Sequence, residues 1–158
     1  MKQFKKARGF TLIEVLVVIG IIAILAAIVI IAINPARQFA QARNSQRMSN
    51  VNAILNAIGQ RLADNRGVWT VVSGCEDLPT ATTTNVGSAV ADIDLSCLVP
   101  TYIPSQLPVD PTTGSWVSAS NYNTSYTVVA SSTGRVSVCA PAYNEDALGN
   151  PGQYCVTR

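Results

Sequence analysis

The sequence predicts an α+β protein in which a long N-terminal α-helix packs against a small antiparallel β-sheet head. Three observations predict this class. An apolar run fills residues 10–33, an amphipathic helical pattern follows in residues 34–66, and short β-prone runs separated by turn residues occupy residues 67–158. A head of about 90 residues cannot build a large core by itself, so the amphipathic helix must supply one wall of it.

The apolar run from Phe10 to Ile33 is long enough to cross a membrane. As a helix it would span about 36 Å, and a hydrocarbon core is ~30 Å thick. A cleaved secretory signal is the alternative, but its apolar core is usually only about 7–15 residues long. The preceding leader, residues 1–9, has no acid and four cations, Lys2, Lys5, Lys6 and Arg8. This charge favours a leader in the cytoplasm and a head outside.

Glu14 is the one acid within the apolar run. A carboxylate costs up to ~2.5–3.5 kcal/mol at the centre of a membrane helix and less near its end. Glu14 either reaches the nearby interface or pairs with a cation. Cutting after Gly9 would free the amine of Phe10, and in a helix bundle this amine could pair with Glu14 of a neighbouring subunit.

The residues Arg8-Gly9-Phe10-Thr11-Leu12-Ile13-Glu14-Val15-Leu16 resemble the prepilin signature of type IV pilins and of type II secretion pseudopilins. The resemblance implies a pilin-like fold, cleavage between Gly9 and Phe10, N-methylation of Phe10 and an assembly role for Glu14. It implies four partners: a prepilin peptidase and methyltransferase, other pilin subunits in a homopolymer, a pilus or secretion assembly platform, and the cell membrane. Pro35 is a departure, because many members carry a proline earlier in the apolar segment.

The expected organisation is a cleaved leader (1–9), a transmembrane and assembly helix (10–33), an amphipathic helix (34–66) and a disulfide-stapled β-rich head (67–158). Before assembly the subunit would cross the cell membrane once, with its head outside. After assembly it would lie in an extracellular filament or a pseudopilus.

The amphipathic helix is predicted from an apolar stripe. Its members recur at spacings of three and four: Met48, Val51, Leu55, Ile58 and Leu62, widened by Ile54. Pro35 predicts a kink or break at Asn34, and Asn65-Arg66-Gly67 predicts the end. Five arginines follow the segment: Arg37, Arg43, Arg47, Arg61 and Arg66. They form either a solvated face or contacts with acidic neighbours or lipid headgroups.

The head is predicted to contain three or four antiparallel strands. The β-prone runs are Val68–Val72, Ser115–Ser118, Tyr126–Ala130 and Arg135–Cys139, and the last two read as a hairpin. Residues 80–88 are rich in threonine and are expected to form a surface loop.

Four cysteines, Cys75, Cys97, Cys139 and Cys155, all lie in the part predicted to be outside the cell. An even number in an exported domain favours disulfides, and four cysteines allow three connectivities. Spacing favours Cys75–Cys97 and Cys139–Cys155. A zinc site is the rival, but it would need closely spaced pairs, and none exist.

A proline-rich segment of the head, Leu107-Pro108-Val109-Asp110-Pro111, resembles a Leu-Pro-x-Asp-Pro motif of pseudopilin and Gram-positive-type pilin heads. Some relatives also bind calcium in a C-terminal acidic loop. The local candidates are Asn144, Glu145 and Asp146, but their order does not match an EF-hand loop. A solvated turn is the favoured interpretation, and no metal or cofactor is expected.

Composition narrows the function classes. The chain has 158 residues with a formal charge of +2, and removing the leader's four cations leaves seven basic against nine acidic residues. This balance makes nucleic-acid binding unlikely. Histidine is absent, which excludes histidine-based triads, and no catalytic constellation is evident, so no enzyme is expected. Together with the prepilin resemblance, this implies a structural subunit of a type IV pilus-like surface filament, processed by prepilin peptidase and polymerised through its N-terminal apolar helix, for adhesion, motility or DNA uptake. The alternatives are a type II secretion pseudopilin or a minor pilin that acts as a membrane-anchored binding module.

Overall fold

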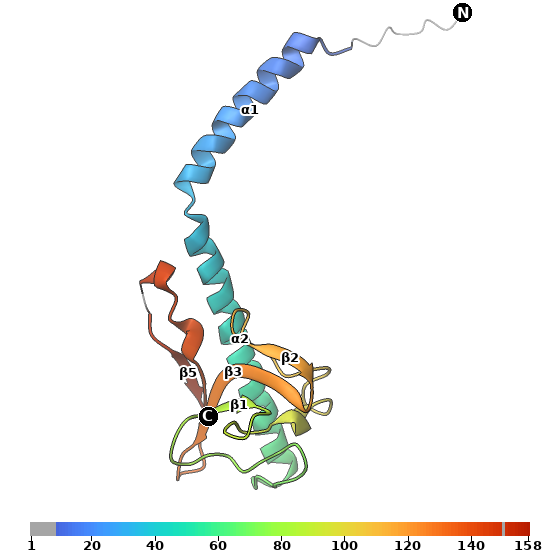
Figure 1. The fold of residues 1–158 in the computed structure, drawn as a ribbon, viewed down its shortest axis with the longest axis vertical. Helices are drawn as coiled ribbons and strands as arrows, with labels where there is room; N and C mark the ends of the chain where they lie inside the picture. Colours follow the sequence, from blue (N-terminus) through green and yellow to red (C-terminus); the bar gives the residue numbers. More distant parts are fainter. Residues whose placement is uncertain (1–8, 150) are drawn as a thin grey trace, which may run out of the picture. The chain divides into compact units, whose positions relative to one another are not determined.

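The computed structural model describes residues 9–149 and 151–158, so the expected leader lies outside the described residues except for Gly9. The chain divides into two units, with the boundary between Gln38 and Phe39. The first contains the apolar helix and the second contains the β-sheet head (Figure 1).

The apolar helix α1 spans Leu12–Ala32, and every one of its side chains is exposed in the isolated chain. It begins two residues after Phe10 because Thr11 is its N-cap, and Ile33 at its other end has extended backbone. At ~1.5 Å per residue it is about 31 Å long, which matches a hydrocarbon core of ~30 Å. In the described part of the chain it is the one helix that is long and apolar enough to cross a membrane.

The second helix, α2, spans Pro35–Asp64. Proline is favoured in the first turn of a helix, where its missing N–H is not needed. The side chain of Asn34 accepts a hydrogen bond from the N–H of Arg37 at 3.2 Å and caps this end. Arg66 and Gly67 adopt positive φ values of 59° and 84°, and the Gly67 N–H bonds to the Leu62 carbonyl at 2.7 Å. The break near Asn34 and the stop at residues 65–67 are therefore present as expected.

The head contains a five-stranded antiparallel sheet with the order β1-β3-β4-β5, and β2 pairs with β3 off this path. The strands are β1 (Thr84–Gly87), β2 (Ser115–Ser118), β3 (Asn121–Ala130), β4 (Val136–Ala140) and β5 (Tyr154–Thr157). Asn123 of β3 is opposite both Gly87 of β1 and Ser115 of β2, so β1 and β2 lie on opposite edges of β3. Short 3₁₀-helices cover Ser96–Leu98, Pro141–Tyr143 and Asp146–Leu148.

The core of the head lies between one face of α2 and the sheet. Val51, Ile54 and Ile58 of α2 are fully buried and belong to one apolar cluster with Tyr126 and Val138. Met48 lies at the edge of the stripe and stays 39% exposed. The helix therefore supplies a wall of the head, and the α+β, pilin-like class predicted from the sequence is confirmed.

The strands of the head differ from the prediction in three places, and β3 also begins earlier than expected, at Asn121 instead of Tyr126. Val68–Val72 is a loop with exposed valines and a single bridge between Val72 and Cys75, because the chain turns back directly after the positive-φ pair at Arg66-Gly67. The expected surface loop at residues 80–88 contains β1, which pairs with β3 and buries Val86. Strand β5 was missed altogether, and it lies beside β4, where Cys155 is opposite Cys139.

Candidate functional site

The predicted processing site lies just before the first residue of α1. Gly9 and Phe10 have no regular secondary structure and are exposed, and the Phe10 side chain is 88% exposed. A Cβ added to Gly9 would meet no atom within 4 Å, so internal packing does not require glycine here. The Gly9–Phe10 bond is therefore an accessible, non-helical peptide bond.

Glu14 caps the beginning of its own helix. One carboxylate oxygen, Oε2, accepts hydrogen bonds from the Thr11 N–H and the Thr11 hydroxyl, both at 2.8 Å. The Glu14 N–H in turn donates to the Thr11 hydroxyl at 3.3 Å. This reciprocal pattern is a capping box, and the Thr-x-x-Glu spacing could have revealed it in the sequence.

The capping box uses one of the two carboxylate oxygens of Glu14 and leaves the other available for a hydrogen bond. Oε1 takes part in no hydrogen bond among the described residues, because both Thr11 donors use Oε2. Phe10, Glu14 and Val18 border the same surface crevice of α1, as side chains spaced by four residues do. The site thus presents one free carboxylate oxygen beside an apolar surface, within one turn of the predicted new N-terminus.

A second cluster of charged side chains lies inside the head. Arg47 of α2 is almost fully buried and donates to Asp110 Oδ2 from Nε at 2.6 Å. Its Nη1 also pairs with Glu145 Oε1. Arg43, one turn earlier, donates to both oxygens of Glu145, at 2.8 and 2.7 Å. Two arginines of one helix therefore hold two distant loops.

The predicted loop residue Asp110 is an anchor for its own turn. Its Oδ1 accepts hydrogen bonds from the N–H groups of Thr112 and Thr113 at 2.8 and 3.0 Å. Gly114 is required here, because a Cβ would lie 2.5 Å from the Asp110 backbone nitrogen. The motif-like segment thus closes a tight turn around a buried carboxylate.

The cluster keeps its acids ionised. Burial alone would raise the pKa of Asp110, but hydrogen bonds from Arg47 and from Thr112 outweigh it and hold this pKa well below its usual range. Hydrogen bonds from Arg43, with Arg47 adding to them, lower the pKa of Glu145 to about 2. The bonds with Asp110 and Glu145 likewise raise the pKa of Arg47 against the effect of burial.

The arginines of α2 were expected either to be solvated or to contact acidic neighbours or lipid headgroups, and different arginines follow different alternatives. Arg37 and Arg66 are exposed, whereas Arg43 and Arg47 contact acids of the same chain. Arg61 is also buried; it donates to Thr70 and lies 5.2 Å from the ring centroid of Trp69. The prediction of a fully solvated face is wrong for Arg47 and Arg61, because residues that follow α2 in the sequence fold against both side chains.

The acidic C-terminal turn does not resemble a calcium site. Both oxygens of Glu145 accept hydrogen bonds from guanidinium groups, so this acid is already neutralised. No group of three or more metal-ligating side chains is present among residues 9–149 and 151–158. The simple solvated turn was also wrong for Glu145, whose side chain is only 13% exposed.

The cysteines lie in the pairs expected from their spacing. Cys75 and Cys97 are bonded with Cα atoms 5.3 Å apart, and Cys139 and Cys155 with Cα atoms 4.1 Å apart. The first bond joins two loops, and the second joins β4 to β5.

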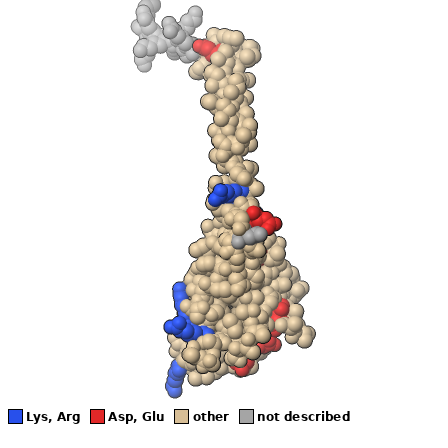
Figure 2. Space-filling model, turned by 90° about the vertical axis from the view of Figure 1, so that its left-hand side faces the viewer, with Lys and Arg blue, Asp and Glu red and all other residues tan. Residues whose placement is uncertain are grey.

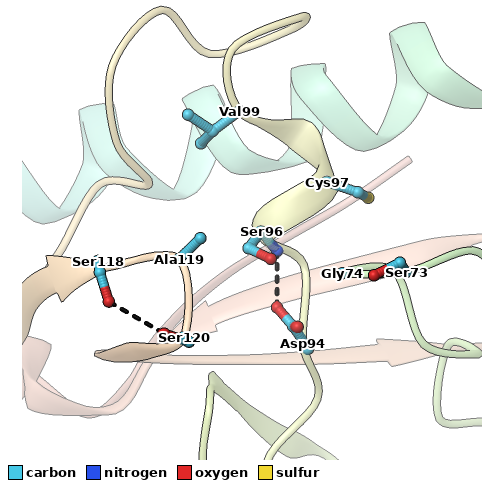
Figure 3. Close-up of a pocket in the computed structure, with 9 residues that line it drawn as sticks. All are labelled: Ser73, Gly74, Asp94, Ser96, Cys97, Val99, Ser118, Ala119 and Ser120. Carbon is cyan, nitrogen blue, oxygen red and sulfur yellow. Dashed lines mark hydrogen bonds between the residues drawn. The ribbon is translucent and has the colours of Figure 1, made fainter.

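A hollow of about 520 Å³ lies beside the first disulfide (Figure 3). Its polar lining consists of Asp94 and the hydroxyls of Ser73, Ser96, Ser118 and Ser120. Asp94 Oδ1 already accepts from the Ser96 N–H at 2.8 Å and the Tyr122 hydroxyl at 2.7 Å. The Ser118 and Ser120 hydroxyls share a hydrogen bond with each other, at 3.2 Å.

The fold and the N-terminal site together define a pilin-like α+β protein with an apolar N-terminal helix. Residues 4–32 match the family model of the prokaryotic N-terminal methylation motif, which is the signature of type IV pilins and pseudopilins. This match includes Gly9, Phe10 and Glu14 and ends at the last residue of α1. Searches of curated proteins and of solved structures found no match to the chain.

Proposed function

We propose that the chain is a structural subunit of a type IV pilus-like surface filament, which polymerises through α1 after removal of residues 1–9. The observation that carries this proposal is the methylation motif at residues 4–32 on a fully exposed apolar helix. No side chain of this helix is buried by any of the described residues. It is suited to lipid before assembly and to other copies of itself afterwards.

Glu14 would join one subunit to the next. Its free Oε1 could accept a hydrogen bond from the Phe10 amine that cleavage creates on a neighbour. Burying both charges as a pair would relieve two desolvation penalties and fix the axial position of the incoming subunit. The capping box would hold the carboxylate in place without using this oxygen.

The partners follow from these steps. A prepilin peptidase would cut the Gly9–Phe10 bond, and a methyltransferase would modify the amine of Phe10. The subunit would then move from the cell membrane, with its head outside, onto an assembly platform and into an extracellular homopolymer. Cys75–Cys97 and Cys139–Cys155 would form in that oxidising location.

A pseudopilin of a type II secretion system is the second candidate. The Leu107–Pro111 segment is compatible with this candidate, because it resembles a motif found in pseudopilin heads and also in Gram-positive-type pilin heads. Its Asp110 is buried and bonded to Arg47. A short pseudopilus and a surface pilus would use the same N-terminal chemistry.

The test is to express the chain with a pilus assembly system and to examine both processing and filaments. Intact mass spectrometry should show a mature N-terminus at Phe10, and electron microscopy should show surface filaments. Gly9→Ile should leave an uncut precursor in the membrane and no filaments, with Gly20→Ile as a matched control for a glycine inside α1. A mature N-terminus at any other residue would contradict the proposal.

A further inference from the structure

Several charges of the head that form no ion pair among the described residues lie near opposite edges of the sheet. Strand β5 forms one edge and β1 the other. Figure 2 shows basic and acidic atoms gathered on opposite sides of the lower part of the head. Among the described residues, the arginines that form ion pairs are Arg43 and Arg47, so the charges at both edges have no ionic partner within this part of the chain.

The basic edge contains Arg135 and Arg158. Arg135 lies in the turn between β3 and β4, and Arg158 directly follows β5. Two backbone hydrogen bonds between Val136 and Arg158, at 2.8 and 2.9 Å, hold the two arginines close together. Both are exposed. The guanidinium of Arg158 donates hydrogen bonds to two neutral side chains, those of Asn52 and Asn56.

The acidic edge is a segment that lies outside β1. Ile93 bridges to Val86 of β1 and places Asp92 and Asp94 along this edge. Glu76 joins them, because its N–H bonds to the Asp94 carbonyl and its side chain accepts the Asp94 N–H. Asp77 follows it in sequence and is exposed. The edge therefore carries four acids, none of which takes part in an ion pair within the described residues.

We propose that the basic edge of one head docks against the acidic edge of a second copy of this chain. The inference rests on the proposed filament function and adds a lateral contact between heads. Inside the head, the buried Asp110 and the partly buried Glu145 each pair with an arginine, whereas the two edges hold complementary charges that form no ion pair among the described residues.

The geometry of this contact suits a polymer. The two surfaces differ, so each copy can bind one neighbour through its basic edge and another through its acidic edge. Such a head-to-tail contact does not close on two copies and continues as a ring or an open chain. Exposed ion pairs are weak individually but guide the docking and orientation of a partner.

The composition of the chain permits a direct test. All lysines lie in the leader, at positions 2, 5 and 6, so the processed chain has no lysine side chain. Arg158→Lys keeps the charge and introduces a single side-chain amine at the basic edge. A carbodiimide then joins this amine to any carboxylate in direct contact, and peptide mass spectrometry identifies the acid. Arg37→Lys is the matched control, an exposed position outside the head unit.

We expect Arg158→Lys to give covalent dimers in which residue 158 is linked to Glu76, Asp77, Asp92 or Asp94, in filaments and in membranes crowded with subunit. Arg37→Lys should give no link to these acids. Links from residue 158 to other acids only, or no dimers in either fraction, would overturn the inference. Missing filaments with the expected dimers still present in membranes would instead overturn the proposed function and support the contact.

Charge reversal gives a second readout. The double variant Arg135→Glu/Arg158→Glu should lower the number of filaments about tenfold, since the like charges now repel. Asp77→Arg/Asp92→Arg should do the same, and all four changes together should restore filaments. Normal filaments from either double variant would count against the contact, provided that a non-reducing gel shows the same processed, disulfide-bonded subunit.

Discussion

At the scale of single residues, Glu14 has two separable properties. Its carboxylate closes a capping box with Thr11, and its charge is available to a neighbouring subunit. In the sequence, Glu14 stands out as an isolated acid in an apolar run. Part of the reason that the apolar helix can hold this carboxylate is its contact with the neighbouring Thr11. Two hydrogen bonds from Thr11 replace water around one oxygen.

Glu14→Gln separates these properties, because glutamine also serves at the third helical position of a capping box. Membrane insertion and processing should be unchanged or slightly improved, since an amide costs less than a carboxylate in the bilayer. Filament number should fall sharply, because the charge that recruits the Phe10 amine is gone. Electron microscopy and a blot for processed subunit measure the two effects.

Thr11→Val is the matched control for this prediction. It removes the hydroxyl of the cap and keeps the charge of Glu14, so the helix should lose about 1 kcal/mol of capping while filaments persist. Abundant normal filaments from Glu14→Gln as the only subunit would show that Glu14 merely reaches the membrane interface.

Arg47 forms ion pairs with both Asp110 and Glu145 in the head. Replacing it by methionine keeps the volume but leaves Asp110 buried without a counter-ion. We expect a loss of about 3–5 kcal/mol in the free energy of unfolding, which is typical when one partner of a buried ion pair is removed. Urea unfolding of the processed chain in detergent micelles, followed by near-ultraviolet circular dichroism, measures it.

Arg66→Met is the control, because Arg66 is exposed and makes no ion pair within the described structure. It should change the free energy of unfolding by less than about 0.5 kcal/mol. Equal stability of Arg47→Met and the unaltered chain would show that Asp110 needs no counter-ion in the fold.

At the scale of elements, both long helices could be predicted, whereas two of the short strands could not. Helices α1 and α2 follow from an unbroken apolar run and a stripe with helical spacing. Strand β2, the second half of β3 and strand β4 follow from β-prone runs around turn residues. Strands β1 and β5 have four residues each, and Val86 is the one apolar side chain of β1. Their existence depends on pairing with β3 and β4, which local sequence does not encode.

The same reason limits prediction of the charged cluster. Arg47 is 63 residues from Asp110 and 98 from Glu145 in the sequence. Only the fold of the head brings them together, and no spacing rule connects such distant positions. By contrast, the predicted N-terminal site, Gly9 to Glu14, is a run of six residues at the start of α1. Its residues could therefore be proposed from the sequence alone.

The disulfide Cys139–Cys155 should stabilise β5, a strand that was not predicted from the sequence. Cys139 and Cys155 are 16 residues apart and link β4 to β5. Replacing both by serine should lower the free energy of unfolding by about 3 kcal/mol, as expected for a loop of this size. Thermal unfolding of the purified chain measures the change.

Peptide mapping without reduction checks the connectivity that this prediction assumes. Protein purified from the cell surface should yield Cys75 linked to Cys97 and Cys139 linked to Cys155. Free thiols, or a bond between Cys97 and Cys139, would show the pairing to be wrong.

At the scale of the whole molecule, the head should be stable at neutral pH and weaken in acid. Two acids, Asp110 and Glu145, link α2 to separate loops, and both have a pKa below the usual value in the folded state. Carboxyl groups in an unfolded chain have pKa values of about 4. The folded state binds fewer protons than the unfolded state in this range, so acid favours unfolding.

The sign and the range of this pH effect follow from the two pKa shifts. The stabilisation is complete above about pH 5, where both acids are ionised in either state, and it declines as the pH falls toward the folded pKa of Glu145, about 2. The urea midpoint of the processed chain, measured from pH 7 to pH 2, should therefore fall below about pH 5. Glu145→Gln removes one of the two titrating groups and should make this decline shallower, although its stability at pH 7 is already lower. A decline of unchanged size in Glu145→Gln would show that Glu145 does not contribute to the acid response of the head.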